Sequence, residues 1–187
     1  MCSRCYEELE HLALTPQRIV EGKKVYCAGV YSKNLQKLIR GLKYHNQRDL
    51  AYFLARFMLD YWSQITNRTD FEVVPVPIFP KREKQRKYNH MNLVGEEFCK
   101  LTGNTLNTSL VSRIKNTRPQ YNLKRPERIK NLENAFAVNS QNYKGKTILL
   151  IDDICTTGTT FEQMIKQLKK SGIEDIICLA ATTPFGE

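Results

Sequence analysis

The stretch from Thr147 to Thr160 constrains the fold of this chain more than any other part of the sequence. Residues 148–151 form an unbroken apolar run of Ile and Leu, which is typical of a strand buried on both faces of a sheet. The run ends on two adjacent carboxylates, Asp152 and Asp153, and a helical pattern begins near Phe161. The stretch therefore predicts a strand, a tight loop and a helix, with two acids at the edge of the sheet.

Small hydroxyl residues and one glycine make up this loop, namely Thr156, Thr157, Gly158, Thr159 and Thr160. Such a loop directs backbone N–H groups and hydroxyls at one point, and the positive end of the following helix strengthens their attraction for an anion. Two carboxylates would repel a bare phosphate, so we expect a ligand that also carries a polyol or a metal ion. Ribose 5-phosphate meets both requirements. The plainer interpretation is a buried strand followed by a capped helix, with the acids as caps.

This stretch resembles the phosphoribosyl pyrophosphate (PRPP) motif of type I phosphoribosyltransferases. The resemblance implies that Asp152 and Asp153 hold the ribose hydroxyls, directly or through Mg²⁺, and that the loop holds the 5-phosphate. It also implies the α/β fold of that superfamily. The alternation of predicted strands and helices along the chain favours the same architecture, a parallel sheet with helices on both faces.

The hydrophobic pattern divides the chain into a small N-terminal appendage, residues 1–24, and a phosphoribosyltransferase-like domain, residues 25–187. Within the domain, strands are predicted at 25–31, 71–77, 110–114, 135–138 and 175–182, in addition to the one before the acids. Helices are predicted at 35–42, 49–62, 93–101 and 126–132. The segment 7–24 has no sustained period and is expected to be a connector, and 115–125 is expected to be mobile.

The cysteines indicate reduced thiols and an incomplete metal site. Cys2 and Cys5 form a Cys-x-x-Cys, which is half of a structural zinc site, and only His11 and Cys27 lie nearby as further ligands. We therefore expect a paired thiol or a remnant and no bound zinc. The sequence has no long apolar run and no signal-peptide pattern, so we expect a cytoplasmic protein without a membrane span.

The positive charge is concentrated in the middle of the chain. Residues 81–130 contain 13 Lys and Arg against four Glu, whereas the net charge of the whole chain is +10. This excess favours a polyanionic partner such as pyrophosphate or nucleic acid, although a solvated basic face would explain it as well.

Two basic loops carry the residues expected to neutralise a leaving pyrophosphate and to exclude water. The first, residues 79–90, leaves the carboxyl end of a predicted parallel strand, where α/β proteins bind ligands. The expected pyrophosphate contacts are Pro77, which lies just before this loop, and Lys81, Arg82 and Lys87 within it. Besides the two acids, the expected catalytic residues are Arg86 in this loop and Arg118 and Lys124 in the second basic loop, residues 115–125.

Nearly the whole chain resembles the ComF family of competence-associated proteins. The resemblance rests on Val74-Pro-Val-Pro77, on the basic residues that follow and on spaced residues between Arg113 and Phe136. The family signature Arg-Gly-Phe-Asn-Gln stands here as Arg86-Lys87-Tyr88-Asn89-His90, in which Lys87 has less conformational freedom than the glycine it replaces. The resemblance implies a role in DNA uptake during natural transformation, with single-stranded DNA and a competence helicase as partners.

Two classes of function follow from these observations. The first is a phosphoribosyltransferase or PRPP-binding protein, with a nucleobase salvage or orotate phosphoribosyltransferase as the alternative enzyme. The second is a nucleic-acid-handling module that keeps the fold without turnover, in which Tyr88 and Tyr121 could stack on bases. The expected nucleic-acid contacts are Lys84, Arg86, Lys87, Tyr88, Arg113, Arg125 and Arg128.

Overall fold

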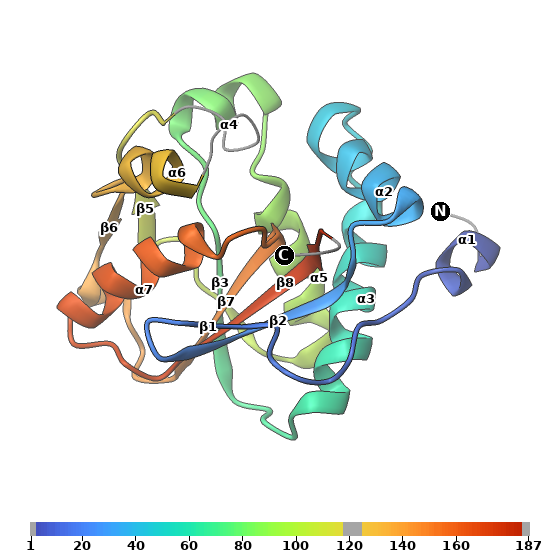
Figure 1. Cartoon of the computed structure of the whole chain (residues 1–187), viewed down its shortest axis with the longest axis horizontal. Helices are drawn as coiled ribbons and strands as arrows, with labels where there is room; N and C mark the ends of the chain where they lie inside the picture. Colours follow the sequence, from blue (N-terminus) through green and yellow to red (C-terminus); the bar gives the residue numbers. More distant parts are fainter. Residues whose placement is uncertain (1–2, 118–124, 185–187) are drawn as a thin grey trace.

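The computed structural model describes residues 3–117 and 125–184 of the chain, and a six-stranded sheet lies at its centre (Figure 1). Its strands, in spatial order, are β1 (Arg18–Val20), β2 (Lys23–Val30), β8 (Ile176–Thr183), β7 (Thr147–Ile154), β3 (Phe71–Pro75) and β4 (Thr105–Leu106). Only β1 is antiparallel to its neighbour, and all other pairs in this sheet are parallel. The predicted α/β architecture with a mostly parallel sheet is thereby confirmed.

Alternate residues of the central strands face two separate hydrophobic cores. On one face, Leu149 and Ile151 of β7 pack with α2 (Lys33–Tyr44), α3 (Leu50–Ile65) and α5 (His90–Thr102). On the other, Ile148 and Leu150 pack with α7 (Thr159–Lys170). Figure 1 shows α2 and α3 to the right of the sheet and α7 to the left. Because both faces of β7 are covered, the strand is apolar along its length until it reaches the acids.

A smaller antiparallel ribbon stands apart from the main sheet. It consists of β5 (Val111–Arg113) and β6 (Phe136–Val138), which are joined along the chain through α6 (Arg125–Leu132). Both segments are strands, as expected, but their assignment to the parallel sheet is wrong. Leu110, Val111 and Phe136 bury their side chains in the core that contains α7, so the ribbon packs beside that helix (Figure 1).

Three further segments either differ from the structure that the sequence predicts or have no counterpart among the predicted elements. The expected connector 7–24 contains β1, and α1 (Ser3–Glu7) precedes it. The expected loop after β3 contains the helix α4 (Pro80–Arg86), in which Pro80 occupies a first-turn position that needs no N–H donor. A short 3₁₀ helix, Ser140–Asn142, leads from β6 to β7. No helix of residues 3–117 and 125–184 is both long and apolar enough to cross a membrane.

Lys87 ends α4 in the left-handed region, with φ of 68°. A lysine is strained there, whereas glycine is not. We expect Lys87→Gly to be about 0.5–1 kcal/mol more stable than Lys87→Ala, since both remove the charge and only glycine relieves the strain. Urea unfolding of the two variants measures the difference, and equal stabilities would contradict it.

Candidate functional site

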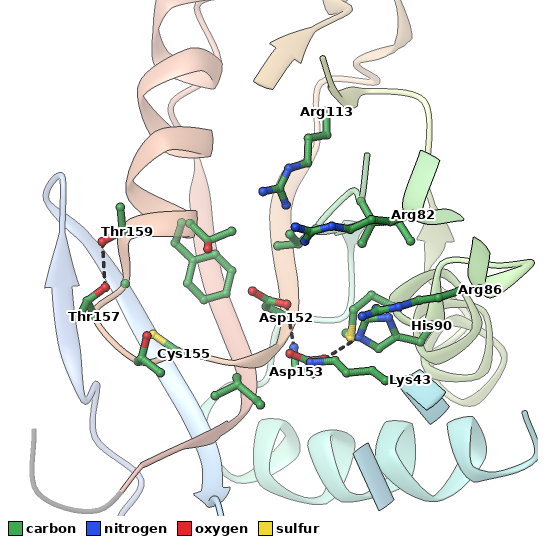
Figure 2. A pocket seen from close by; sticks show the side chains of 18 of the residues that line it. Lys43, Arg82, Arg86, His90, Arg113, Asp152, Asp153, Cys155, Thr157 and Thr159 are labelled. Carbon is green, nitrogen blue, oxygen red and sulfur yellow. Dashed lines mark hydrogen bonds and ion pairs between the residues drawn. The ribbon is translucent and has the colours of Figure 1, made fainter. Parts of the chain in front are cut away.

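The two acids and the threonine loop meet at the carboxyl end of β7, where they line a cavity of about 560 Å³ (Figure 2). The loop, residues 155–158, leads into the N-terminus of α7. Gly158 has φ of 78°, and a Cβ added there would lie 3.0 Å from Cγ2 of Val20 in β1. The loop therefore needs glycine both for its turn and for its close packing on β1.

The loop has the geometry of an anion-binding site. The hydroxyls of Thr157 and Thr159 are hydrogen-bonded to each other at 2.8 Å, and the residues from Thr156 to Thr160 all line the cavity. The first-turn N–H groups of a helix have no acceptor within the helix, and its dipole favours negative charge there. The structure thus brings Thr156 to Thr160 together at the cavity, and phosphate binding by this loop stays a prediction.

Asp153 is held by two cationic or hydrogen-bonding partners from other elements. The carboxylate is buried; its Oδ2 accepts a hydrogen bond from Nε2 of His90 at 2.5 Å and forms an ion pair with Nζ of Lys43. Lys43 belongs to the last turn of α2, and His90 begins α5. Asp153 therefore ties both helices to the end of β7.

The two acids consequently differ in their ionisation. Burial alone would raise the pKa of Asp153, but Lys43 and His90 hold it well below its usual range. Burial, together with the charge of Asp153, raises the pKa of Asp152 to about 8. Burial lowers the pKa of His90, so its ring is neutral and Nε2 carries the proton that it donates to Asp153.

Two arginines point into the cavity on the side of Asp152 away from the loop (Figure 2). Nη2 of Arg82 donates to the carbonyl oxygen of Thr117 at 2.7 Å, and Nη2 of Arg113 donates to the hydroxyl of the same residue. Burial and the charge of Arg82 lower the pKa of Arg113 to about 10. Two guanidinium groups that both donate to Thr117 offer positive charge to a multiply charged anion.

Of the other predicted site residues, Arg86 also lines the cavity. Lys81, Lys84 and Lys87 are exposed outside it, and Pro77 lies between two of its lining residues without lining it. Arg125 and Arg128 belong to α6. Arg118, Tyr121 and Lys124 lie outside the described residues.

Two predicted nucleic-acid contacts are placed differently from the expectation. Tyr88 is only 9% exposed, its hydroxyl donates to the carbonyl oxygen of Leu42 at 2.6 Å, and Arg48 covers its ring, so it is not available to stack on a base. Its assignment as a stacking residue is wrong, because the tyrosine joins α2 to the segment after α4. Arg113 lines the cavity and does not belong to an outer basic face.

Three residues of the site carry no assignment from the sequence. Lys43 and His90 lie far from Asp153 along the chain and meet it only through tertiary packing. Tyr44 is 61% exposed and lines the cavity, and the guanidinium carbon of Arg86 lies 5.3 Å from the centre of its ring. The available signals were the position of Lys43 and Tyr44 directly after the first predicted helix and the position of His90 in the Arg86–His90 signature.

Within residues 3–117 and 125–184, no group of three or more His, Cys, Asp and Glu side chains is placed to hold a metal ion. Cys2 lies outside the described residues, and Cys5 is exposed. The expectation that zinc is not bound stays a prediction.

The raised pKa of Asp152 has a consequence for stability. A carboxyl with a folded-state pKa of about 8 and an unfolded one near 4 binds more protons when folded, so it lowers stability as the pH rises between these values. As the pH rises from 5 to 8.5, we expect the free energy of unfolding of Asp152→Asn to increase by at least about 1 kcal/mol relative to that of the wild type, or by about 2–4 °C in Tm. This value allows for the screening of the carboxylate by solvent in the cavity.

Thermal unfolding of the ligand-free protein across this pH range measures the effect. Asp49→Asn, at the exposed N-terminus of α3, controls for the loss of one carboxylate. Parallel pH profiles for the wild type and Asp152→Asn would contradict the assignment.

Comparison with known proteins agrees with the fold and with the site. Residues 105–183, which include β7, both acids and the threonine loop, match the family model of the phosphoribosyl transferase domain. The chain is 29% identical to Competence protein F of Haemophilus influenzae over 94% of its own length and 81% of that protein. It is 24% identical to DNA utilization protein YhgH of Salmonella typhimurium, over 97% of its own length and 84% of that protein.

A shorter match links the chain to a phosphoribosyltransferase enzyme. Amidophosphoribosyltransferase of Rattus norvegicus is 45% identical over 50 residues, which are 27% of this chain and 10% of that protein. Residues 105–183 therefore match the phosphoribosyl transferase domain, and nearly the whole chain is similar to competence protein F and DNA utilization protein YhgH.

Proposed function

We propose that the cavity binds PRPP, with ribose 5-phosphate as the part of the ligand that the loop and the acids recognise. The 5-phosphate would lie on the loop from Thr156 to Thr160, the ribose hydroxyls on Asp152, and the pyrophosphate on Arg82 and Arg113. The observation that carries the proposal is the order of these groups in one cavity, because Asp152 lies between the threonine loop and two arginines.

The two acids would then have different roles. Asp153 is already neutralised by Lys43 and hydrogen-bonded to His90, and its Oδ2 makes both contacts. Asp152 lines the cavity, and one of its oxygens accepts the N–H of Asp153 at 2.9 Å. A second oxygen is left to accept hydrogen bonds from the ribose.

A Mg²⁺ ion brought in with PRPP fits the donors at this site. Such an ion keeps several waters and substrate oxygens and needs only one or two carboxylates from the protein. Asp152 would be its protein ligand. When bound, the ion would neutralise part of the pyrophosphate charge.

The same residues could support transfer of the phosphoribosyl group. Departure of pyrophosphate from the ribose leaves a cationic, oxocarbenium-like carbon and a highly charged anion. Arg82 and Arg113, which both line the cavity, would stabilise that anion.

A thermal-shift series tests the ligand class. We expect PRPP with Mg²⁺ to raise the Tm most, ribose 5-phosphate and pyrophosphate each to raise it less, and ribose alone to have no effect. Equal shifts with ribose and ribose 5-phosphate, or with sulfate at the same ionic strength, would contradict recognition by the phosphate loop.

Single-stranded DNA is the second ligand that we propose, on a face beside the cavity. Lys81, Lys84 and Lys87 are exposed on and after α4, and the exposed ring of Tyr44 lies on the rim where a base could stack. The names of competence protein F and DNA utilization protein YhgH refer to competence and to DNA utilization, and these names favour DNA as the ligand.

The salt dependence of DNA binding distinguishes this face from a general basic surface. Each phosphate contact contributes a slope of about −0.7 on single strands, so replacement of Lys81, Lys84 and Lys87 by Ala should reduce the slope by about 2 units. Replacement of Lys24, Lys144 and Lys170, which are exposed elsewhere, is the matched control. Equal slopes for the two triple variants would exclude this face as the DNA site.

A further inference from the structure

Thr117 is a buried, uncharged residue that contacts both arginines of the cavity. Its main-chain oxygen accepts a hydrogen bond from Nη2 of Arg82 at 2.7 Å, and its side-chain hydroxyl accepts one from Nη2 of Arg113. Only 5% of the residue is exposed. The two guanidinium groups come from elements that are distant along the chain, α4 and β5, and they meet at Thr117.

The ribbon holds the guanidinium of Arg113 on a second side. Arg113 lies opposite Phe136 in the pairing of β5 with β6, and its Cζ atom lies 5.5 Å from the centre of that buried ring. Its Nε atom is buried and has no hydrogen-bond partner within residues 3–117 and 125–184. An aromatic ring restricts the tilt of a guanidinium group but not its rotation in its own plane, so the hydroxyl of Thr117 fixes the direction of the Nη donors.

The two arginines repel each other, and Thr117 offsets part of this repulsion. Burial and the charge of Arg82 lower the pKa of Arg113 to about 10, so Arg113 still carries its charge at pH 7. Two such side chains would turn away from each other if both were free in water. The two oxygens of Thr117 place partial negative charge beside both guanidinium groups, which keeps them together when no anion is bound.

We infer that Thr117 is a positioning residue that holds Arg82 and Arg113 together so that one pyrophosphate can accept hydrogen bonds from both. The inference rests on the proposed function, which assigns pyrophosphate to these two arginines. Pyrophosphate carries oxygens on two phosphorus atoms, so it can contact two guanidinium groups at once. Thr117 is not among the described residues that line the cavity, and it therefore acts through the arginines.

Donors that are held in place before the ligand arrives bind it more tightly. An arginine side chain has many rotamers, and the loss of this freedom on binding weakens the affinity for the ligand. Thr117 holds Arg113 through its side chain but holds Arg82 through its main chain. A substitution of Thr117 that removes only the hydroxyl should therefore release Arg113 and leave Arg82 as it is.

Calorimetric titration of pyrophosphate into Thr117→Val and Thr117→Ser tests the effect on binding. Valine has the shape of threonine without the hydroxyl, so we expect it to weaken the affinity for pyrophosphate about 3–10-fold, whereas serine keeps the hydroxyl and should restore the wild-type affinity. Binding of ribose 5-phosphate should be unchanged in both variants.

Wild-type affinity for pyrophosphate in Thr117→Val would overturn the inference, as would an equal loss of affinity for ribose 5-phosphate, which would indicate a general effect on the fold. In the first case the proposed pyrophosphate site would stand if the Arg82→Ala/Arg113→Ala double variant still lost its affinity for pyrophosphate. No binding of pyrophosphate by the wild type would overturn both the site and the role of Thr117.

Nitrogen NMR of the arginine side chains in the ligand-free protein tests the positioning itself. We expect the guanidinium group of Arg113 to rotate about its Nε–Cζ bond about tenfold faster in Thr117→Val than in the wild type or Thr117→Ser, because a hydrogen bond from a charged group is lost. The rotation of Arg82 should be unchanged, since its acceptor is a main-chain oxygen. Equal rates for Arg113 in the three proteins would overturn the inference, whatever the protein binds.

Discussion

Replacement of Asp153 by Asn is expected to destabilise the protein by about 3–5 kcal/mol at pH 7, because it leaves a buried cation without its partner. Asp153 holds Lys43 and His90 together at the junction of β7, α2 and α5. The lowered pKa of Asp153 gives the sign of the pH dependence: the contribution is present above the unfolded-state pKa near 4 and is lost as the pH falls below it.

Urea unfolding at pH 7 measures this loss, which corresponds to a decrease in Tm of roughly 10 °C. Asp60→Asn is the matched control, since its ion pair with Arg56 lies on the surface of α3 and should contribute less than about 1 kcal/mol. The double variant Lys43→Met/Asp153→Leu removes both charges and should recover much of the stability. A loss for Asp153→Asn no larger than that for Asp60→Asn would show that the buried ion pair is not a stabilising junction.

The second large effect concerns the two arginines of the cavity. We expect Arg113→Ala and Arg82→Ala each to weaken binding of inorganic pyrophosphate by about 10–100-fold, since a hydrogen bond to a charged group contributes about 1.5–3 kcal/mol. The fold should survive the loss of Arg113, because the burial and like-charge repulsion that lower its pKa are removed with it.

Calorimetric titration of pyrophosphate into each variant checks the effect, and Arg68→Ala, on an exposed segment remote from the acids, controls for the loss of one positive charge. If the Arg82→Ala/Arg113→Ala double variant bound pyrophosphate with an affinity within twofold of the wild type, the two arginines would not form the pyrophosphate site.

The part of the site that the sequence predicted is the part built from one continuous segment. An apolar strand, two acids, a threonine loop and a helix lie within residues 147–170, and local pattern determines all of them. Lys43 and His90 reach Asp153 from helices that are distant along the chain. Such contacts depend on how helices pack on the sheet, about which a single sequence carries little information.

Other errors have similar physical causes. The charged segment of α4 has no apolar period, so nothing in its pattern distinguishes a short solvated helix from a loop. β5 and β6 have strand-like sequences, but pattern alone does not tell which partner a strand will pair with. Tyr88 and Tyr44 both lie beside basic residues, and only tertiary packing determines that the first is buried and the second exposed.

Titration calorimetry of PRPP with Mg²⁺ into Gly158→Ala and Gly145→Ala determines whether the loop after β7 binds the 5-phosphate of PRPP. Both glycines have positive φ, 78° and 75°, so both variants carry similar backbone strain. Only at Gly158 would the added Cβ press on Val20 and move the loop. We expect one site per chain, with affinity at least tenfold weaker in Gly158→Ala and unchanged in Gly145→Ala. No binding by the wild type, or equal affinities in both variants, would contradict 5-phosphate binding by this loop.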